Sequence, residues 1–128
     1  MVLDSSAIVA IHLQEPGHER LIERIDDAAV VVVGVPTLLE TMMLLTARLG
    51  YDARPMISAF LRRVHAEVVA FNEEHLDAAS AAYLRLGRGR HSAALNFGDC
   101  MSYAIASAAG MPLLFTGDDF SKTDIQQA

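Results

Sequence analysis

Short apolar runs alternate along this chain with longer segments that show helical periodicity. Continuous apolar runs that predict strands lie at residues 2–3, 30–33, 67–71 and 113–116. Apolar residues at helical spacing predict helices over residues 5–14, 18–27, 36–49, 53–65, 73–86 and 97–109. The run Val30–Val33 has no polar position for a solvent-facing side, so it predicts a central parallel strand that is buried on both faces.

Residues that commonly start or stop helices stand at several of the predicted boundaries. Pro36 lies in the first turn of its helix, where a missing N–H is harmless. Gly50 and Gly110 directly follow two of the predicted helices, in the position where glycine commonly ends one. Asn72 could cap the helix that follows it. These residues support the helix boundaries independently of the periodicity.

The order of the elements predicts a single three-layer α/β/α domain over residues 1–128, because strands that alternate with helices form parallel sheets. The expected sheet is mainly parallel and has about five strands. The last of them is a short edge strand at residues 123–125. Right-handed crossovers place a functional crevice beyond the carboxyl ends of such strands. Asp4 and Asp118 both follow a predicted strand, so we expect both at this crevice.

Composition limits the class of protein. The chain has 128 residues, of which 52% are hydrophobic, so one domain can bury a core without disulfides. Its single cysteine, Cys100, excludes an internal disulfide, suits a reducing cytoplasm and is expected to be a small buried side chain. We expect a cytoplasmic protein with no membrane partner, because the sequence shows no secretory signal and no apolar run of ~18 residues.

Four acidic residues stand in or beside apolar segments, where a carboxylate is costly unless it is paired, hydrogen-bonded or bound to a cation. They are Asp4, Glu40, Asp99 and Asp118. Three of them also have an ordinary structural interpretation. Asp4 could cap the helix after it, Asp99 could complement the positive end of its helix, and Asp118 could be a turn residue. Glu40 is more informative, because its helical neighbours are mostly apolar.

Together the four acids predict a divalent cation that they all bind. We expect this cation to make the four acids the catalytic residues. Carboxylates in one site repel one another, and oxygen ligands favour Mg²⁺, with Mn²⁺ as an alternative. A bound cation of this kind activates water and neutralises a phosphodiester. Asp119 is a rival to Asp118 for the fourth position. The hydroxyls of Ser6 and Thr116 could orient a carboxylate or a bound water.

Positive charge is scarce but clustered. The formal net charge is −6, so the surface as a whole repels nucleic acid, and a nucleic-acid substrate would require a local basic patch or metal ions. Arg85, Arg88 and Arg90 gather positive charge just before the last long helix. They are either a solvated loop or a clamp for a phosphate backbone beside the acidic centre.

Three segments of the chain, together with Glu40 in the third helix, form a recognisable pattern. The segments are Met1-Val2-Leu3-Asp4-Ser5-Ser6-Ala7, Leu95-Asn96-Phe97-Gly98-Asp99-Cys100 and Leu114-Phe115-Thr116-Gly117-Asp118-Asp119-Phe120-Ser121-Lys122-Thr123-Asp124-Ile125. Over essentially its whole length the chain resembles PIN-domain ribonucleases, and more narrowly the VapC-type toxins of bacterial toxin–antitoxin pairs. The second and third segments are the most specific parts of this resemblance.

The resemblance implies a Mg²⁺-dependent endoribonuclease that is the toxin of a type II toxin–antitoxin pair. It implies metal ligation centred on Asp4 and Asp99, with Glu40 and Asp118 completing the acidic quartet. It also implies a homodimer and a cognate antitoxin whose C-terminal segment blocks the active site.

Other functions fit the same fold class. A phosphotransfer receiver would have an acidic pair after the first strand, and a haloacid-dehalogenase-like phosphatase would have Asp-x-Asp there, whereas this chain has Asp4-Ser5-Ser6. A non-catalytic binding module with the same fold is a third alternative, although the four acids argue against it. The endoribonuclease is therefore the function that the sequence favours.

Overall fold

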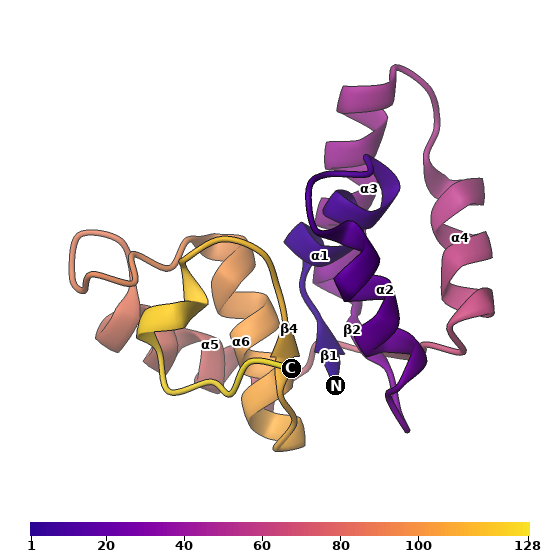
Figure 1. The fold of residues 1–128 in the computed structure, drawn as a ribbon. Coiled ribbons are helices and arrows are strands. Elements are labelled where there is room, and N and C mark those ends of the chain that lie inside the picture. The colour runs from indigo at the N-terminus through magenta and orange to yellow at the C-terminus, as the bar shows by residue number, and fades with distance from the viewer.

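Four short parallel strands form the centre of the computed structural model, which describes residues 1–128 (Figure 1). They lie side by side in the order β3–β2–β1–β4. The strands are β1 (Val2–Leu3), β2 (Val32–Gly34), β3 (Glu67–Val69) and β4 (Leu113–Leu114). Val2 pairs with Val32 on one side and with Leu113 on the other, so β1 is a central strand together with β2.

Six α-helices and one short 3₁₀-helix complete the fold. They are α1 (Ser5–His12), α2 (His18–Asp26), α3 (Val35–Leu49), α4 (Arg54–Arg63), α5 (Glu73–Leu86), α6 (Phe97–Ala109) and η1 (Phe120–Lys122). Gly50 and Gly110 follow α3 and α6 in the left-handed conformation, as predicted for residues that end helices. The side chain of Asn72 accepts the His75 N–H at 3.1 Å, so this residue caps α5 as predicted.

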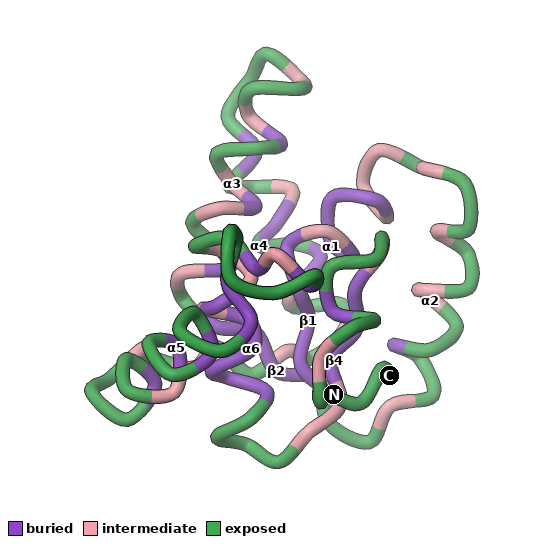
Figure 2. The backbone as a smooth tube through the Cα atoms, turned by 90° about the vertical axis from the view of Figure 1, so that its left-hand side faces the viewer, coloured by how far each residue is buried: buried purple, intermediate pink, exposed green.

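The sheet separates two layers of helices because alternate strand residues point to opposite faces. Val2, Val32 and Leu113 join a buried cluster with residues of α5 and α6, which also contains Cys100. The next residue of each strand points the other way. Leu3, Val33 and Leu114 pack in a second cluster with residues of α1, α2 and α4. Figure 2 shows that burial is concentrated where the strands and their covering helices meet. The predicted three-layer α/β/α class is confirmed.

The boundaries of β2 and β4 differ from the predictions. β2 begins at Val32 rather than Val30; the Val30 side chain is exposed, and its carbonyl accepts a hydrogen bond from the N-terminal amine at 2.6 Å. β4 ends at Leu114 rather than Thr116, since the Thr116 N–H bonds to the side-chain oxygen of Ser6. Both strands are shorter than the predicted runs, and at the end of β4 a side-chain oxygen takes the place of a ladder bond.

The predicted fifth strand is wrong. Residues 123–125 follow η1 and form no strand. The chain touches the sheet edge only at its end, where the Leu113 N–H donates to Gln126 and the Ala128 N–H donates to the Leu113 carbonyl. The sheet therefore has four strands and a C-terminal tail that covers the edge of β4. None of the helices combines the length and the hydrophobicity that crossing a membrane requires.

Candidate active site

Asp4 lies at the carboxyl end of β1, where the strand passes directly into α1. Its side chain caps α1: one carboxylate oxygen, Oδ2, accepts the Ser6 N–H at 3.0 Å and the Ser6 hydroxyl at 2.6 Å. The residue is 3% exposed, and its other oxygen, Oδ1, has no hydrogen-bond partner. A buried carboxylate oxygen without a partner is costly. Asp4 therefore caps α1 with one carboxylate oxygen, and its other oxygen is free to bind a ligand.

Ser6 links the ends of two neighbouring strands. Its hydroxyl donates to Asp4 after β1 and accepts the Thr116 N–H, which follows β4, at 3.1 Å. Ser6, which we predicted to orient a carboxylate, thus donates a hydrogen bond to the carboxylate of Asp4. Thr116 contributes through its backbone N–H to this link.

Asp99 lies in the first turn of α6 and forms a reciprocal capping pair with Asn96. The Asn96 N–H donates to the Asp99 carboxylate at 2.7 Å, and the Asp99 N–H donates to the Asn96 side-chain oxygen at 3.0 Å. Burial raises the pKa of Asp99 to about 6, the bond from Asn96 opposes this, and the charges of Asp4, Asp119 and Glu40 raise it further. The charges of these three carboxylates therefore reach Asp99.

Glu40 projects from α3 toward the start of α6. Its pKa is raised by burial and by the charge of Asp4, while a hydrogen bond from Ser5 lowers it. The carboxylate lies against Gly98, where a Cβ atom would come within 2.6 Å of Oε2. Such a distance is not tolerated between unbonded atoms. The glycine therefore leaves the space that Glu40 occupies beside Asp99.

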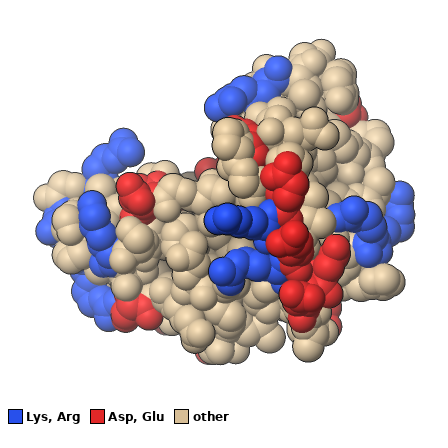
Figure 3. Space-filling model, in the orientation of Figure 1, with Lys and Arg blue, Asp and Glu red and all other residues tan.

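These acids surround one cavity of about 280 Å³ beyond the carboxyl ends of β1 and β4. Its polar and charged lining is Asp4, Ser5, Ser6, Glu15, Glu40, Arg48, Asn96, Asp99, Thr116 and Asp119. In Figure 3 the surface is notched between the side formed by α5 and α6 and the side formed by the first four helices. The predicted crevice at the carboxyl ends of the strands is thus an acidic cavity.

Of the two adjacent acids considered for the fourth position, Asp119 lies at this cavity, whereas the sequence analysis favoured Asp118. Asp119 lines the cavity and Asp118 does not. Both residues are exposed, and the carbonyl of Asp118 accepts the N–H and the hydroxyl of Ser121 at 3.2 and 2.6 Å. Gly117 has a positive φ of 84°, which turns the chain just before this pair. The turn, rather than distance from the strand end, selects which acid faces the cavity.

The basic residues are arranged differently from the predicted clamp. Arg85 forms an ion pair with Asp124 at 3.0 Å and donates to the Tyr103 hydroxyl at 3.1 Å. Arg90 lies 5.4 Å from the centre of the Tyr83 ring. Neither they nor Arg88 line the acidic cavity. Contact of this loop with RNA stays a prediction.

The sequence analysis missed four polar residues that line the cavity: Ser5, Glu15, Arg48 and Asn96. Arg48 is the next charged residue after Glu40 on the same helix, which is the signal that could have identified it. Asn96 stands three residues before Asp99, the spacing of a capping pair. Glu15 lies in the turn after α1 and carries no comparable sequence signal.

The donor set of the cavity fits a hard divalent cation. It offers carboxylate oxygens from several elements, including the unpartnered Oδ1 of Asp4, and no thiolate or imidazole. In this geometry no three histidine, cysteine or acidic side chains are close enough together to form a ready-made metal site. The acids therefore line the cavity, but no three of them are close enough to form a metal site in this geometry.

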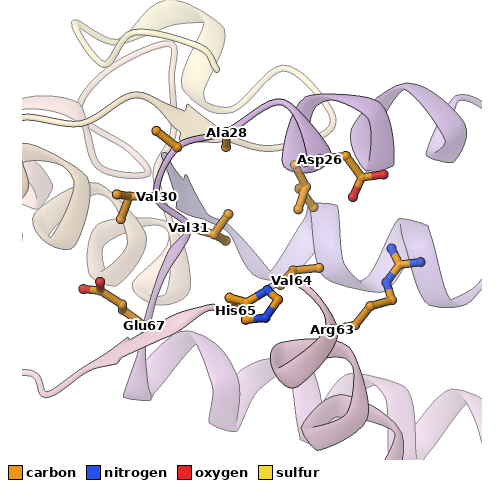
Figure 4. A pocket seen from close by; sticks show the side chains of 10 residues that line it. Asp26, Ala28, Val30, Val31, Arg63, Val64, His65 and Glu67 are labelled. Carbon is orange, nitrogen blue, oxygen red and sulfur yellow. The ribbon is translucent and has the colours of Figure 1, made fainter.

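A second polar cavity, of about 380 Å³, lies at the opposite end of the sheet, before β2 and β3 begin. Figure 4 shows Asp26, Arg63, His65 and Glu67 around it. None of the predicted site residues lies there.

Comparisons with known proteins identify the family of this chain. The family model of the PIN domain matches residues 1–126. The chain is 41% identical to ribonuclease VapC30 of Mycobacterium tuberculosis over 98% of its length and 95% of that protein. It is 42% identical to a ribonuclease VapC of Mycolicibacterium smegmatis over 98% of its length and 97% of that protein.

Two solved structures share the fold at low sequence identity. VapC20 of Mycobacterium tuberculosis, described as a toxin that cleaves the sarcin-ricin loop, superposes with a TM-score of 0.77 at 20% identity, covering 99% of this chain and 97% of that one. A toxin–antitoxin complex from Klebsiella pneumoniae gives 0.70 at 11% identity, covering 96% and 92%. From the family model and the full-length relatives, this chain belongs to the PIN-domain family and, within it, to the VapC-type ribonucleases.

Proposed function

We propose that this protein is a Mg²⁺-dependent endoribonuclease and the toxin of a type II toxin–antitoxin pair, acting in the cytoplasm. The observation that carries the proposal is the buried, unpartnered Oδ1 of Asp4 in a cavity whose other acids are Glu15, Glu40, Asp99 and Asp119. The names of the full-length relatives support the ribonuclease activity. They offer no support for a receiver, a phosphatase or a non-catalytic module.

Each acid would have a distinct part in holding the cation. Ser6 fixes Oδ2 of Asp4 and leaves Oδ1 to bind it. The Asn96 N–H fixes one oxygen of Asp99, and Gly98 makes room for the Glu40 carboxylate next to it. Asp119 is our candidate for the fourth acid, in place of Asp118. When bound, Mg²⁺ would activate water and neutralise the charge of a phosphodiester, and Mn²⁺ would supply the same chemistry.

The raised pKa values of Asp99 and Glu40 have a consequence for the proposed activity. With a pKa of about 6, Asp99 is largely ionised at neutral pH and largely protonated at pH 5. Cation binding requires the ionised form. Activity should therefore fall as the pH is lowered through 6.

We also propose a homodimer and an antitoxin as partners. α3, α5 and α6 present exposed apolar side chains, among them Phe97 (79% exposed), Leu84 (62%) and Met43 (61%). Two apolar cavities of about 500 and 630 Å³ lie along this face and share Phe97 and Met101. Apolar patches of this kind mark protein–protein contacts. A second copy of the chain would cover this face, and the C-terminal segment of an antitoxin would block the acidic cavity.

Cleavage of a structured RNA by the purified protein tests the proposed function. We expect cleavage with added Mg²⁺ or Mn²⁺ and none in excess EDTA. Asp99→Asn should reduce the rate by more than about 100-fold, because changes in the outer shell of a metal site already cost about 10–100-fold in affinity or activity. Asp26→Asn, at the opposite end of the sheet, is the control. Full cleavage in EDTA, or by Asp99→Asn, would refute the metal-dependent mechanism.

A further inference from the structure

The acidic cavity contains a single cationic side chain. Its charged lining consists of five acids and one arginine: Asp4, Glu15, Glu40, Asp99, Asp119 and Arg48. An RNA strand that enters this cavity brings further negative charge, which the acids repel. A cation bound by the acids offsets this at the centre of the cavity. Phosphates on either side need another source of positive charge.

Arg48 is free to supply that charge. It is exposed and forms no ion pair or side-chain hydrogen bond, although Glu15 lines the same cavity. Two other arginines are already engaged with carboxylates: Arg54 with Asp52 at 2.7 Å and Arg85 with Asp124 at 3.0 Å. All the N–H donors of the Arg48 guanidinium therefore remain available to a ligand.

The position of Arg48 indicates which phosphate it would meet. It lies on α3 two turns after Glu40, which is about 12 Å further along the helix axis. It is exposed and thus stands at the rim of the cavity, away from the end where Glu40 lies against the first turn of α6. A group at the rim reaches a neighbouring phosphate rather than the one that is cleaved.

We propose that Arg48 binds a phosphate of the RNA substrate that flanks the cleaved bond, and so positions the strand over the acids. The proposal rests on the endoribonuclease function proposed above. The planar guanidinium matches a phosphate with two parallel hydrogen bonds, which a lysine ammonium cannot reproduce. Arg48 is therefore a substrate-binding residue of the site, placed there by α3 rather than by the basic loop before α6.

Binding measured apart from cleavage tests this role. The probe is a fluorescein-labelled, single-stranded RNA oligonucleotide, titrated with the Asp99→Asn protein at several salt concentrations. Adding Arg48→Gln should raise the Kd about 3–10-fold and reduce the slope of log K against log salt by about 0.7, the value for one phosphate contact on a single strand. Arg48→Lys should restore the slope but only part of the affinity. Arg63→Gln, which removes the same charge at the opposite end of the sheet, should change neither.

In the otherwise wild-type enzyme, Arg48→Gln should raise the KM for RNA and leave kcat nearly unchanged, with an unaltered thermal midpoint because the side chain is exposed. An unchanged salt slope for Arg48→Gln, or an equal loss in Arg63→Gln, would overturn the proposal. If the wild-type protein cleaves RNA while Arg48→Gln binds normally, only the role of Arg48 is wrong. If the wild-type protein does not cleave RNA, the proposed function fails, and the salt slope still decides whether Arg48 contacts phosphate.

Discussion

The two polar cavities lie at opposite ends of the same sheet and differ in how their charges are held. At the carboxyl ends of the strands, Asp4 is buried with one oxygen unpartnered, and the pKa of Asp99 is raised to about 6, mainly by burial. At the amino ends, Asp26 and Glu67 stand beside Arg63 and His65 on exposed positions. The first cavity has five acids against one arginine, with Asp4 buried and Asp99 partly buried, while the second mixes both signs of charge on exposed residues.

This difference shows in which cavity a bound ligand can offset the free-energy cost of burying charge. Exposed charges of mixed sign are solvated and contribute little to stability, about 0–1 kcal/mol for a surface pair. Buried carboxylates are destabilising unless a cation or hydrogen bonds compensate them. Charged residues around a cavity are therefore weak evidence of function by themselves. Desolvation of like charges is the stronger indication, and only the cavity with Asp4 and Asp99 shows it.

After the loss expected for Asp99→Asn, the next largest effect separates two adjacent acids. Asp119→Asn should reduce RNA cleavage by about 10–100-fold, because its side chain lines the acidic cavity and the charge it loses supports cation binding. Asp118→Asn and Glu67→Gln should keep nearly full activity. Initial rates at saturating Mg²⁺ measure the difference. A greater loss in Asp118→Asn would restore the original choice of fourth acid and show that the turn rearranges when the metal binds.

A smaller effect is expected from removing the space that Glu40 occupies. Gly98→Ala should lower activity about 10-fold and weaken Mn²⁺ binding measured by calorimetry, because the added Cβ displaces the Glu40 carboxylate. Shortening the acid in Gly98→Ala/Glu40→Asp should recover part of the Mn²⁺ affinity. In a Glu40→Ala background, Gly98→Ala should add little further loss. Additive losses in that background would mean that Gly98 acts independently of Glu40.

The smallest expected effect concerns stability without metal. The pKa of Asp99 is raised in the folded protein from its usual 3.8 to about 6. The folded state therefore binds this proton more tightly than the unfolded state, and its stability falls as the pH rises from about 4 to about 6. In EDTA at pH 8, Asp99→Asn should melt about 2–4 °C higher than the wild type, a modest gain because Asp99 is partly exposed to solvent.

Thermal melts at pH 4.5 and pH 8 measure this gain, which should shrink at the lower pH. Asp118→Asn is the matched control and should melt like the wild type at both. Added Mg²⁺ should stabilise the wild-type protein and leave Asp99→Asn unchanged. A variant that is less stable than the wild type at pH 8 would show that the Asp99 carboxylate supports the fold through its bond with Asn96 more than its burial opposes it.

Much of the architecture was predictable because its causes are local. The alternation of Val2 with Leu3 and of Leu113 with Leu114 between the two faces follows from the pleat of a strand. Glycines at helix ends and an asparagine cap act within a few residues. The boundaries of β2 and the missing fifth strand were not predictable, since they depend on the N-terminal amine at Val30 and on the tail beside Leu113.

The sequence by itself determined the three-layer fold, the family resemblance, and the positions of Asp4, Glu40 and Asp99 in apolar segments. Hydrophobic periodicity and the energetic cost of a desolvated carboxylate are visible in a linear chain. Only the tertiary structure decided that Asp119 rather than Asp118 faces the cavity and that Arg48, rather than Arg85, lies beside the acids. Those outcomes depend on the orientation of the turn at Gly117 and on where α3 places Arg48 relative to the cavity. The spacing of residues along the chain determines neither.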